Sequence, residues 1–539
     1  MKPPYRNRLR FVGLVALGLG AASIGVETVF AQNAMHPCWQ GMVHADSVRA
    51  DLLALTSPSM EGRGTGQPGY LKAAQWVANR LESWQLEHLD NGGTASGPYF
   101  HSVPYLRSMS TGGTLDWNGR KWQMGRDFMP VSRRRADSVR IAPVYRMDCN
   151  TDLEKWSASR SGRASGTGPF AVIYEGRLRG RGDDSQTECW FEFLKKVRAL
   201  GCVQVFYKPT RFSAFKRDWQ SEEAHRVRVR LREGQAVQSS PMGKTPVQPS
   251  QPSQPAQPPQ PMMQEYAVNA ALYRSIRQRS ADFDAAEVNP GGDLVIRSRR
   301  DSFNAPNVVG LIRGKSRPDE YVFLTAHLDH LGVTDGTVYP GADDNGSGSA
   351  VLLSVARALS QLSRQNIQPD RSIVLIWFSG EENGLLGSRW MASTLTDSMG
   401  IGSGQVFANI NMDMLGRSDE EHSPEDPYLY VVHHENNPSI RQFTEQVNSF
   451  CGGMKLDYRY SRSDDPERLF TRSDHYAFHQ LGIPSFFLFS GLHADYHKPT
   501  DTADKISWPR LTRNAGFVLN LAWQMAQRNE RLSPVEEEP

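Results

Sequence analysis

The fold of this chain is decided by the stretch YVFLTAHLD at residues 321–329, where a strand pattern ends in polar residues. Residues 321–326 are mostly aromatic, aliphatic or β-branched, as expected of a buried strand. A glycine-rich turn follows, GADDNGSG at residues 341–348, and apolar residues then recur at helical spacing over 347–362. A strand, a polar turn and a helix in this order predict one unit of a mainly parallel sheet.

The same strand pattern recurs downstream. Residues 372–378, 406–412 and 483–489 are strand-like runs that precede polar residues, and residues 509–527 have helical spacing. We therefore predict an α/β fold, with a mainly parallel mixed sheet covered by helices on both faces. Ligands bind beyond the carboxyl ends of the strands in such sheets, so the polar residues at these ends are the candidate site.

The candidate residues have the chemistry of a two-zinc centre. Zinc binds neutral imidazole and carboxylate, and a pair of ions needs one group that bridges them. We predict Asp344 as the bridge, because the turn after it leads tightly into a helix. One ion would take His327 and Asp413, and the other would take Glu382 and His497.

Two further carboxylates have predicted roles beside the metals. Asp329 follows His327 by two residues and can return to the second imidazole nitrogen, which would fix the tautomer; a direct ligand and a surface charge are the alternatives. Side chains of adjacent residues in extended backbone point in opposite directions. We therefore assign Glu382 to the metal and Glu381 to general-base catalysis on the bridging water.

Other histidines compete for the ligand positions. His493 is the closest rival of His497, because it lies only four residues earlier. The remaining competitors are His330, His433, His434, His475 and His479.

Length and composition predict more than one domain and exclude some functions. The 539 residues carry a net charge of only +3, which does not favour nucleic-acid binding. Residues 43–104 have two helical patterns, and the turn at residues 60–66 between them is interpreted as structural rather than phosphate-binding. Residues 105–294 predict a small α/β accessory domain, in which the Pro/Gln-rich stretch 235–264 has little to bury and is expected to be disordered. The catalytic domain is expected at 295–530.

The amino terminus predicts export. Four basic residues precede an apolar run at residues 11–26, and a signal peptide over residues 1–31 is expected; an uncleaved membrane anchor is the alternative. The five cysteines have no CxxC spacing, so one or two disulfides are expected rather than a cysteine metal site. We expect a periplasmic or secreted protein with no stable membrane insertion after cleavage.

The block at about residues 304–529 resembles, over roughly 220 residues, the M28 zinc peptidases, the family of aminopeptidase Y and the glutamate carboxypeptidases. The matching stretches are AHLD at 326–329, GADDNGSG at 341–348, FSGEENGLLGS at 378–388, NMD at 411–413, SDH at 473–475 and YHKPTDT at 496–502. The resemblance implies two zinc ions bound by the five ligands above, Glu381 as the base and Asp329 as the orienting carboxylate. It also implies that Tyr496 helps to stabilise the tetrahedral intermediate, and that residues 105–294 are similar to a protease-associated domain.

These features predict an exported di-zinc exopeptidase that hydrolyses the N-terminal bond of peptide substrates. A carboxypeptidase or a glutaminyl cyclase on the same scaffold is the nearest alternative. A zinc-binding, receptor-like protein without catalysis is a further one.

Overall fold

The computed structural model describes residues 36–89, 97–117, 119–124, 126–130, 138–140, 144–147, 151, 153, 170–175, 192–197, 202–208, 228–231, 264–279, 293–334 and 336–533. The signal peptide expected at residues 1–31 lies outside these residues. So does all but the last residue of the Pro/Gln-rich stretch 235–264.

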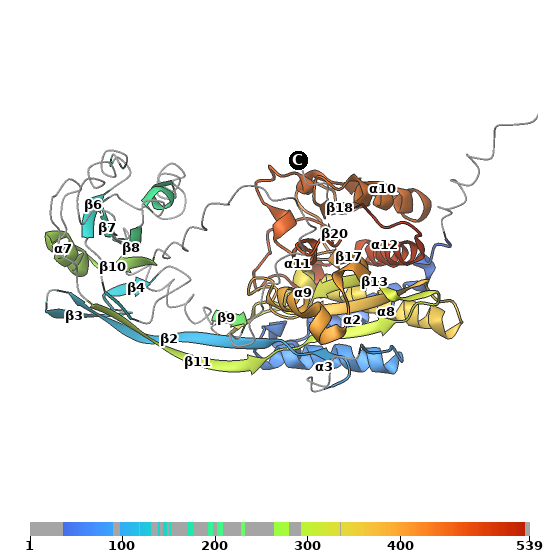
Figure 1. The fold of residues 1–539 in the computed structure, drawn as a ribbon, viewed down its shortest axis with the longest axis horizontal. Coiled ribbons are helices and arrows are strands. Elements are labelled where there is room, and N and C mark those ends of the chain that lie inside the picture. Colours follow the sequence, from blue (N-terminus) through green and yellow to red (C-terminus); the bar gives the residue numbers. More distant parts are fainter. Residues whose placement is uncertain are drawn as a thin grey trace, which may run out of the picture.

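An eight-stranded sheet forms the centre of the larger body, in the order β1-β12-β16-β13-β17-β20-β18-β19 (Figure 1). Its four middle strands, β16, β13, β17 and β20, are parallel. Antiparallel pairs join β1, β12 and β18 to the sheet. The predicted mainly parallel mixed sheet is thus confirmed. The strands are β1 (Phe100–His101), β12 (Asn307–Ile312), β13 (Arg317–His327), β16 (Arg371–Phe378), β17 (Val406–Met412), β18 (Tyr428–His433), β19 (Lys455–Asp457) and β20 (Ser485–Phe489).

Helices cover both faces of this sheet, as the strand composition requires. Val322 and Leu324 of β13 join the core beneath α8 and α12, whereas Phe323 joins the opposite core beneath α9 and α11. This alternation follows from the period of two in a strand. One face carries α2 (Ala45–Leu55), α3 (Pro68–Ser83), α8 (Gly348–Arg364), α10 (Pro438–Val447) and α12 (Trp508–Gln527), and the other carries α9 (Leu386–Met399) and α11 (His475–His479).

A long two-stranded ribbon leads from the larger body to a smaller one (Figure 1). Its strands, β2 (Pro104–Trp117) and β11 (Asp293–Asn304), pair antiparallel along their whole length. The smaller body has its own sheet, β4-β10-β8-β7-β6, and its own apolar cores. The elements on this side are β3 (Arg120–Gln123), β4 (Phe128–Pro130), β5 (Ser138–Arg140), β6 (Val144–Met147), β7 (Phe170–Tyr174), β8 (Cys202–Tyr207), β10 (Gln264–Val268) and α7 (Ala270–Arg279). The strand β9 (Arg228–Leu231) instead pairs with the first residues of β2, at the end of the ribbon next to the larger body (Figure 1).

Short elements complete the larger body, and several of them border the candidate site. They are the hairpin β14 (Gly332–Thr334) and β15 (Thr337–Tyr339) and the helical turns η2 (Gln40–Met42), η3 (Pro58–Arg63), η4 (Ala342–Ser347), η5 (Ser403–Gln405), η6 (Asn448–Gly452), η7 (Arg459–Ser461), η8 (Leu469–Thr471) and η9 (Ala503–Lys505).

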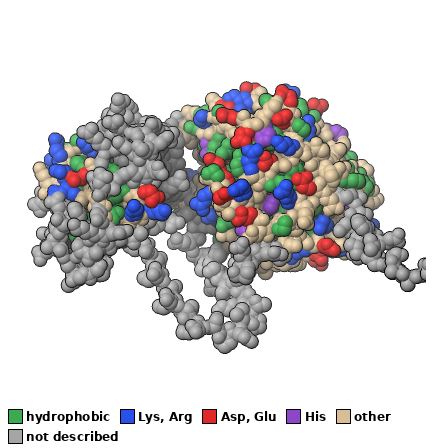
Figure 2. Space-filling model, turned by 90° about the horizontal axis from the view of Figure 1, so that it is seen from above, with side chains coloured by type: hydrophobic (Ala, Val, Ile, Leu, Met, Phe, Trp, Pro, Cys, Tyr) green, Lys and Arg blue, Asp and Glu red, His purple; other side chains and the backbone are tan. Residues whose placement is uncertain are grey.

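The surface of the larger body is of mixed charge. Figure 2 shows acidic and basic side chains interspersed over its visible face. Within the described part of the chain, none of the helices combines the length and apolar character that crossing a membrane requires.

A disulfide ties the first described residues to the larger body. Cys38 is bonded to Cys451 of η6, across 413 residues of sequence. Beside this bond the backbone nitrogen of Trp39 donates to Asn520 of α12, and Gln524 pairs with the backbone of His36. The N-terminal segment is therefore fixed against α12 at several points.

Replacing both cysteines (Cys38→Ser with Cys451→Ser) should lower the free energy of unfolding by about 2–5 kcal/mol, because the unfolded chain loses a long cross-link. Thermal melting measures the effect. Reductant should lower the melting temperature of the wild type to that of the double variant and should leave the variant unchanged. Equal melting temperatures for both proteins in the absence of reductant would contradict this account.

Candidate metal centre

The predicted site residues converge at one edge of the central sheet. Each of them ends a middle strand, lies in the loop just beyond one, or precedes a helix that packs on the sheet. His327 ends β13, Asp344 lies in η4 before α8, Glu381 and Glu382 follow β16, Asp413 follows β17, and His497 lies in the loop after β20. Their common edge is the carboxyl end of the parallel strands, as the fold predicts.

A first group of ligand atoms joins β13, η4 and β17. The Nε2 atom of His327 lies 3.4 Å from Oδ1 of Asp344 and 3.3 Å from Oδ1 of Asp413. The other oxygen of Asp413 accepts a hydrogen bond from Ser473 Oγ at 2.6 Å. One oxygen of Asp413 is thus oriented by the protein and the other faces the group.

A second group lies on the other side of Asp344. The Nε2 atom of His497 is 3.1 Å from Oδ2 of Asp344 and 3.1 Å from Oε2 of Glu382. His330 reaches the same pair, because its Nδ1 is 2.7 Å from Oε1 of Glu382 and 3.7 Å from Oδ2 of Asp344. Asp344 therefore turns one oxygen to each group.

Of the competing histidines, His330 lies among the ligand atoms and His493 lies beside a different carboxylate. His330, considered only as a competitor in the sequence, contributes to the second ligand group together with Asp344 and Glu382. His493 instead places Nε2 3.2 Å from Oδ2 of Asp343, the residue before Asp344. The signal that could have found His330 is its position three residues after His327, in the same loop.

The chemistry of these groups fits bound zinc. Oδ2 of Asp344 is buried and has no hydrogen-bond partner among the described residues, although Nε2 of His497 lies close to it. A buried carboxylate oxygen and an imidazole nitrogen that meet without a hydrogen bond are the atoms that a divalent cation would join. Two nitrogen-and-carboxylate groups that share one carboxylate also have the donor set of a zinc pair.

The loop that carries Asp344 is held by side chains on both sides. Asn345 donates to Met412 O at 2.8 Å and accepts from the backbone nitrogens of Gly348 and Met414. The carboxylate of Asp501 accepts from the backbone nitrogens at 343 and 344. Neither Asn345 nor Asp501 was predicted as a site residue, because their partners come from distant parts of the sequence.

The hydroxyl of Ser347 bonds to the loop around Asp344 rather than to the first turn of α8. Ser347 precedes α8, but no side-chain cap hydrogen bond is formed. Its hydroxyl donates to the backbone oxygen of Asp343 at 2.7 Å and accepts from Leu415 N at 2.8 Å. The hydroxyl therefore stabilises the Asp344 loop instead of the helix end.

Asp329 supports His327 differently from the prediction. The Nδ1 atom of His327 lies 3.0 Å from the backbone oxygen of Asp329, whereas the Asp329 carboxylate is 4.0 Å away. The orienting contact is thus made by the carbonyl. The carboxylate accepts from Thr65 Oγ1 at 2.8 Å and from the backbone nitrogen of Glu381 at 3.1 Å.

The two adjacent glutamates have opposite electrostatic surroundings. Burial raises the pKa of Glu381 well above its usual range, although His327 opposes the shift, and neighbouring carboxylates raise it further. Burial also opposes ionisation of Glu382, but His330 and His497 hold the pKa of Glu382 well below its usual range. The pKa values of the two neighbouring glutamates are thus shifted in opposite directions, as expected where one carboxyl exchanges a proton and the other is a metal ligand.

A small cavity opens beside the ligand groups, with a volume of about 40 Å³. Asp344, Glu381 and Asp413 line one part of it, and Arg472 and Tyr496 line another. Its remaining walls are Met414, Leu469, Ser473, Phe487, Phe489 and Leu492. A substrate bound there would have an apolar wall next to the carboxylates.

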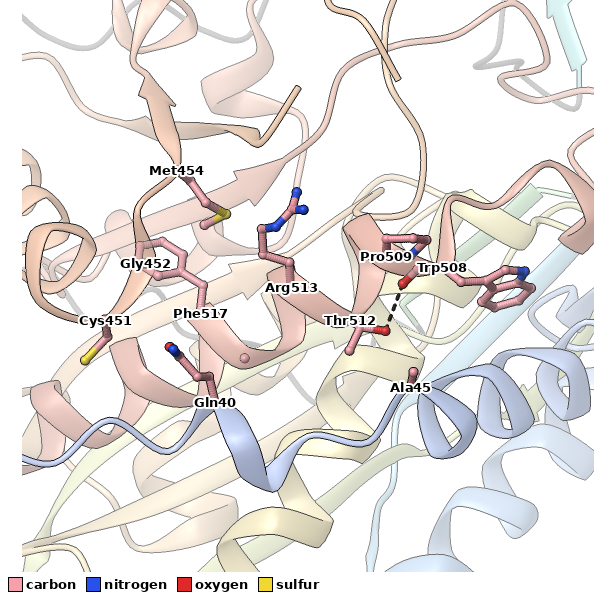
Figure 3. A pocket seen from close by; sticks show the side chains of 11 residues that line it. Gln40, Ala45, Cys451, Gly452, Met454, Trp508, Pro509, Thr512, Arg513 and Phe517 are labelled. Carbon is pink, nitrogen blue, oxygen red and sulfur yellow. Dashed lines mark hydrogen bonds between the residues drawn. The ribbon is translucent and has the colours of Figure 1, made fainter. Parts of the chain in front are cut away.

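Figure 3 shows a larger cavity, of about 500 Å³, between the N-terminal segment at Gln40 and the first turns of α12. None of the candidate ligands lines it. We therefore place the chemistry at the small cavity despite its lesser volume.

Comparison with known proteins agrees with this location. Residues 307–522, which include every predicted ligand, match the sequence profile of Peptidase family M28. This region belongs to peptidase family M28.

Curated relatives of the M28 region are named as peptidases. A probable leucine aminopeptidase of Trichophyton verrucosum is 29% identical over 230 residues, which are 41% of this chain and 58% of that protein. Aminopeptidase YwaD of Bacillus subtilis is 28% identical over 43% of this chain and 47% of its own. A probable glutamate carboxypeptidase VP8 of Zea mays is 29% identical over 44% of this chain and 32% of its own. The matches thus span less than two thirds of each relative.

A solved aminopeptidase from Aneurinibacillus sp. strain AM-1 has a similar fold. The TM-score is 0.51 at 17% identity, over 93% of this chain and 98% of that chain. The likeness extends beyond the M28 region, but at this identity it concerns the fold alone.

Removal of the His497 imidazole (His497→Ala) should lower the zinc content of the purified protein below that of the wild type, because the second group loses a nitrogen ligand. Metal content measured by mass spectrometry after dialysis tests this. His493→Ala is the matched control and should retain the wild-type content. Full retention by His497→Ala, with loss in His330→Ala, would assign the ligand position to His330.

Proposed function

We propose that this chain is an exported di-zinc exopeptidase that removes the N-terminal residue from peptides. The observation that carries the proposal is the sharing of Asp344 between two ligand groups. His327 and Asp413 would hold one ion, and Glu382 and His497 would hold the other. This arrangement is suited to hydrolysis by a co-catalytic metal pair.

Glu381 is proposed as the general base. When bound, a zinc pair lowers the pKa of water and polarises the scissile carbonyl. The Glu381 carboxylate would accept a proton from the attacking water as the new C–O bond forms. It would then give that proton to the leaving amine nitrogen as the C–N bond breaks. The position of Glu381 in the wall of the small cavity, together with Asp344 and Asp413, supports this role.

Tyr496 is proposed to assist at the tetrahedral stage. Its ring stacks on that of His497, with 3.9 Å between the centroids, and its hydroxyl accepts from Arg472 at 3.3 Å. Burial raises the pKa of Tyr496, so the phenol keeps its proton and can donate to a developing oxyanion.

The small cavity supports a substrate with an apolar N-terminal side chain. Its apolar walls, among them Met414, Phe487 and Phe489, would hold that side chain by burial. The free α-amine would be attracted to the carboxylates at the end of the cavity, which would direct cleavage to the N-terminal bond of a peptide.

A carboxypeptidase is the second candidate. Arg472 lines the same cavity, and a guanidinium is suited to bind the terminal carboxylate of a peptide. The two candidates differ in the peptide end that is consumed.

Export is proposed from two features. The basic residues and apolar run over residues 2–26 are typical of a signal peptide. The Cys38–Cys451 disulfide fits an oxidising compartment such as a periplasm or the exterior.

We further propose that residues 105–294, with their separate sheet and cores, act as an accessory domain of the protease-associated type.

Glu381→Gln should reduce kcat by about 10²–10⁴-fold, because the amide cannot accept the proton of water. Zinc content and melting temperature should remain at wild-type values. Glu420→Gln, at an exposed position, is the matched control and should keep full activity. Near-normal turnover by Glu381→Gln would remove this residue from the role of base.

A mixed pool of peptides, followed by mass spectrometry with and without a zinc chelator, tests the reaction itself. We expect loss of single residues from free amino termini, fastest for apolar residues and abolished by the chelator. Trimming from the carboxyl end would favour the carboxypeptidase, and pyroglutamate formation would indicate a glutaminyl cyclase. An unchanged pool with zinc bound would favour a binding protein.

A further inference from the structure

The glycine-rich turn at residues 60–66 reaches the metal centre, although it lies far from it in sequence and outside the M28 region. Gly64 forms a parallel bridge with His330, and the backbone nitrogen of His330 donates to Arg63 O at 3.2 Å. This turn therefore runs beside the loop that carries His327 and Asp329.

Thr65 of this turn connects two functional loops. Its hydroxyl donates to Oδ2 of Asp329 at 2.8 Å and accepts from the backbone nitrogen of Gly380 at 2.9 Å. The other oxygen of Asp329 accepts from the backbone nitrogen of Glu381 at 3.1 Å. A closed ring of hydrogen bonds thus joins the residue that supports His327 to the loop that carries the proposed base.

Arg63 fixes the position from which Thr65 acts. Its guanidinium is fully buried and donates to four backbone oxygens, each at 2.8 Å. They belong to Leu55, Leu328, Pro340 and Gly341. Leu328 directly follows His327, and Gly341 lies three residues before Asp344. Arg63 therefore bonds to the loops that carry both ligand groups.

The backbone of this turn is held in an unfavourable conformation. Glu61 has a backbone φ of 50° and Arg63 a backbone φ of 55°, values that residues other than glycine rarely adopt. Such backbone persists only where the surrounding contacts determine it, and it concentrates at functional sites. The four hydrogen bonds of Arg63 supply these contacts.

We propose that Thr65 is a positioning residue of the metal centre, acting through Asp329 on His327 and through Gly380 on Glu381. The proposal rests on the function proposed above. The carboxylate of Asp329 is fully buried, so loss of the Thr65 hydroxyl leaves one oxygen without its donor. The backbone of Asp329, whose carbonyl contacts His327, and the Glu381 loop then lose their shared support.

Thr65→Val removes the hydroxyl at nearly constant volume. We expect kcat to fall about 10–100-fold with KM within about twofold, and the zinc dissociation constant to rise about 10-fold, since partners of metal ligands have effects of this size. Zinc affinity is measured by competition with a chromogenic chelator. Thr65→Ser restores the hydroxyl and should return both quantities to within about threefold of the wild type.

Thr512→Val is the matched control. Its hydroxyl donates to the backbone oxygen of Trp508 within α12 (Figure 3), and Thr512 lines the larger cavity, which no candidate ligand lines. Loss of this hydroxyl should leave kcat and zinc affinity unchanged. Wild-type kcat and zinc affinity in Thr65→Val would overturn the proposal. So would losses that Thr65→Ser does not reverse, because they would reflect only the packing of the turn.

The zinc measurement also separates this proposal from the function on which it rests. If the wild type binds zinc but cleaves no peptide, the peptidase proposal fails. Weakened zinc binding in Thr65→Val, reversed in Thr65→Ser, would still support the positioning role. Unchanged zinc binding in both variants would overturn it.

Discussion

The metal centre depends on the orientation of one carboxylate. Asp344 presents Oδ1 to His327 and Oδ2 to His497 and His330, so the two ligand groups share this side chain. A small rotation of Asp344 would separate them. The loop around it is accordingly fixed by buried hydrogen bonds: the Asn345 amide donates to Met412 O, and the Asp501 carboxylate accepts from the backbone nitrogens at 343 and 344.

Buried carboxylates are concentrated around Asp344, at the carboxyl edge of the central sheet. Several carboxylates meet at this edge of the sheet, and burial raises the pKa of Asp329 to about 6 and that of Asp474 to about 7. The buried Arg63 and the imidazoles offset part of this charge, and two divalent cations would offset the rest. Metal binding and the stability of the loops are therefore expected to be linked.

Much of the fold and of the candidate site could be predicted from the sequence because both follow from local patterns. The runs at 321–326 and 406–412 are strands, and the polar residues after them mark the strand ends. What could not be predicted depends on contacts between segments that are separated in sequence, by 52 residues for His330 and Glu382 and by more than 260 for most of the others. The partner of Cys38, the support given by Arg63 and Thr65, and the place of His330 beside Glu382 are of this kind. The nearer contact to His327 is the backbone oxygen of Asp329, and sequence spacing does not separate a carbonyl contact from a carboxylate contact.

The central claim is that two metal ions share Asp344. A crystal structure of the zinc-loaded protein, with anomalous data collected on both sides of the zinc absorption edge, tests it most directly. The account predicts two anomalous peaks about 3.5–4 Å apart, one on each side of the Asp344 carboxylate. A single peak in contact with only one ligand group, or a second peak away from Asp344, would contradict it.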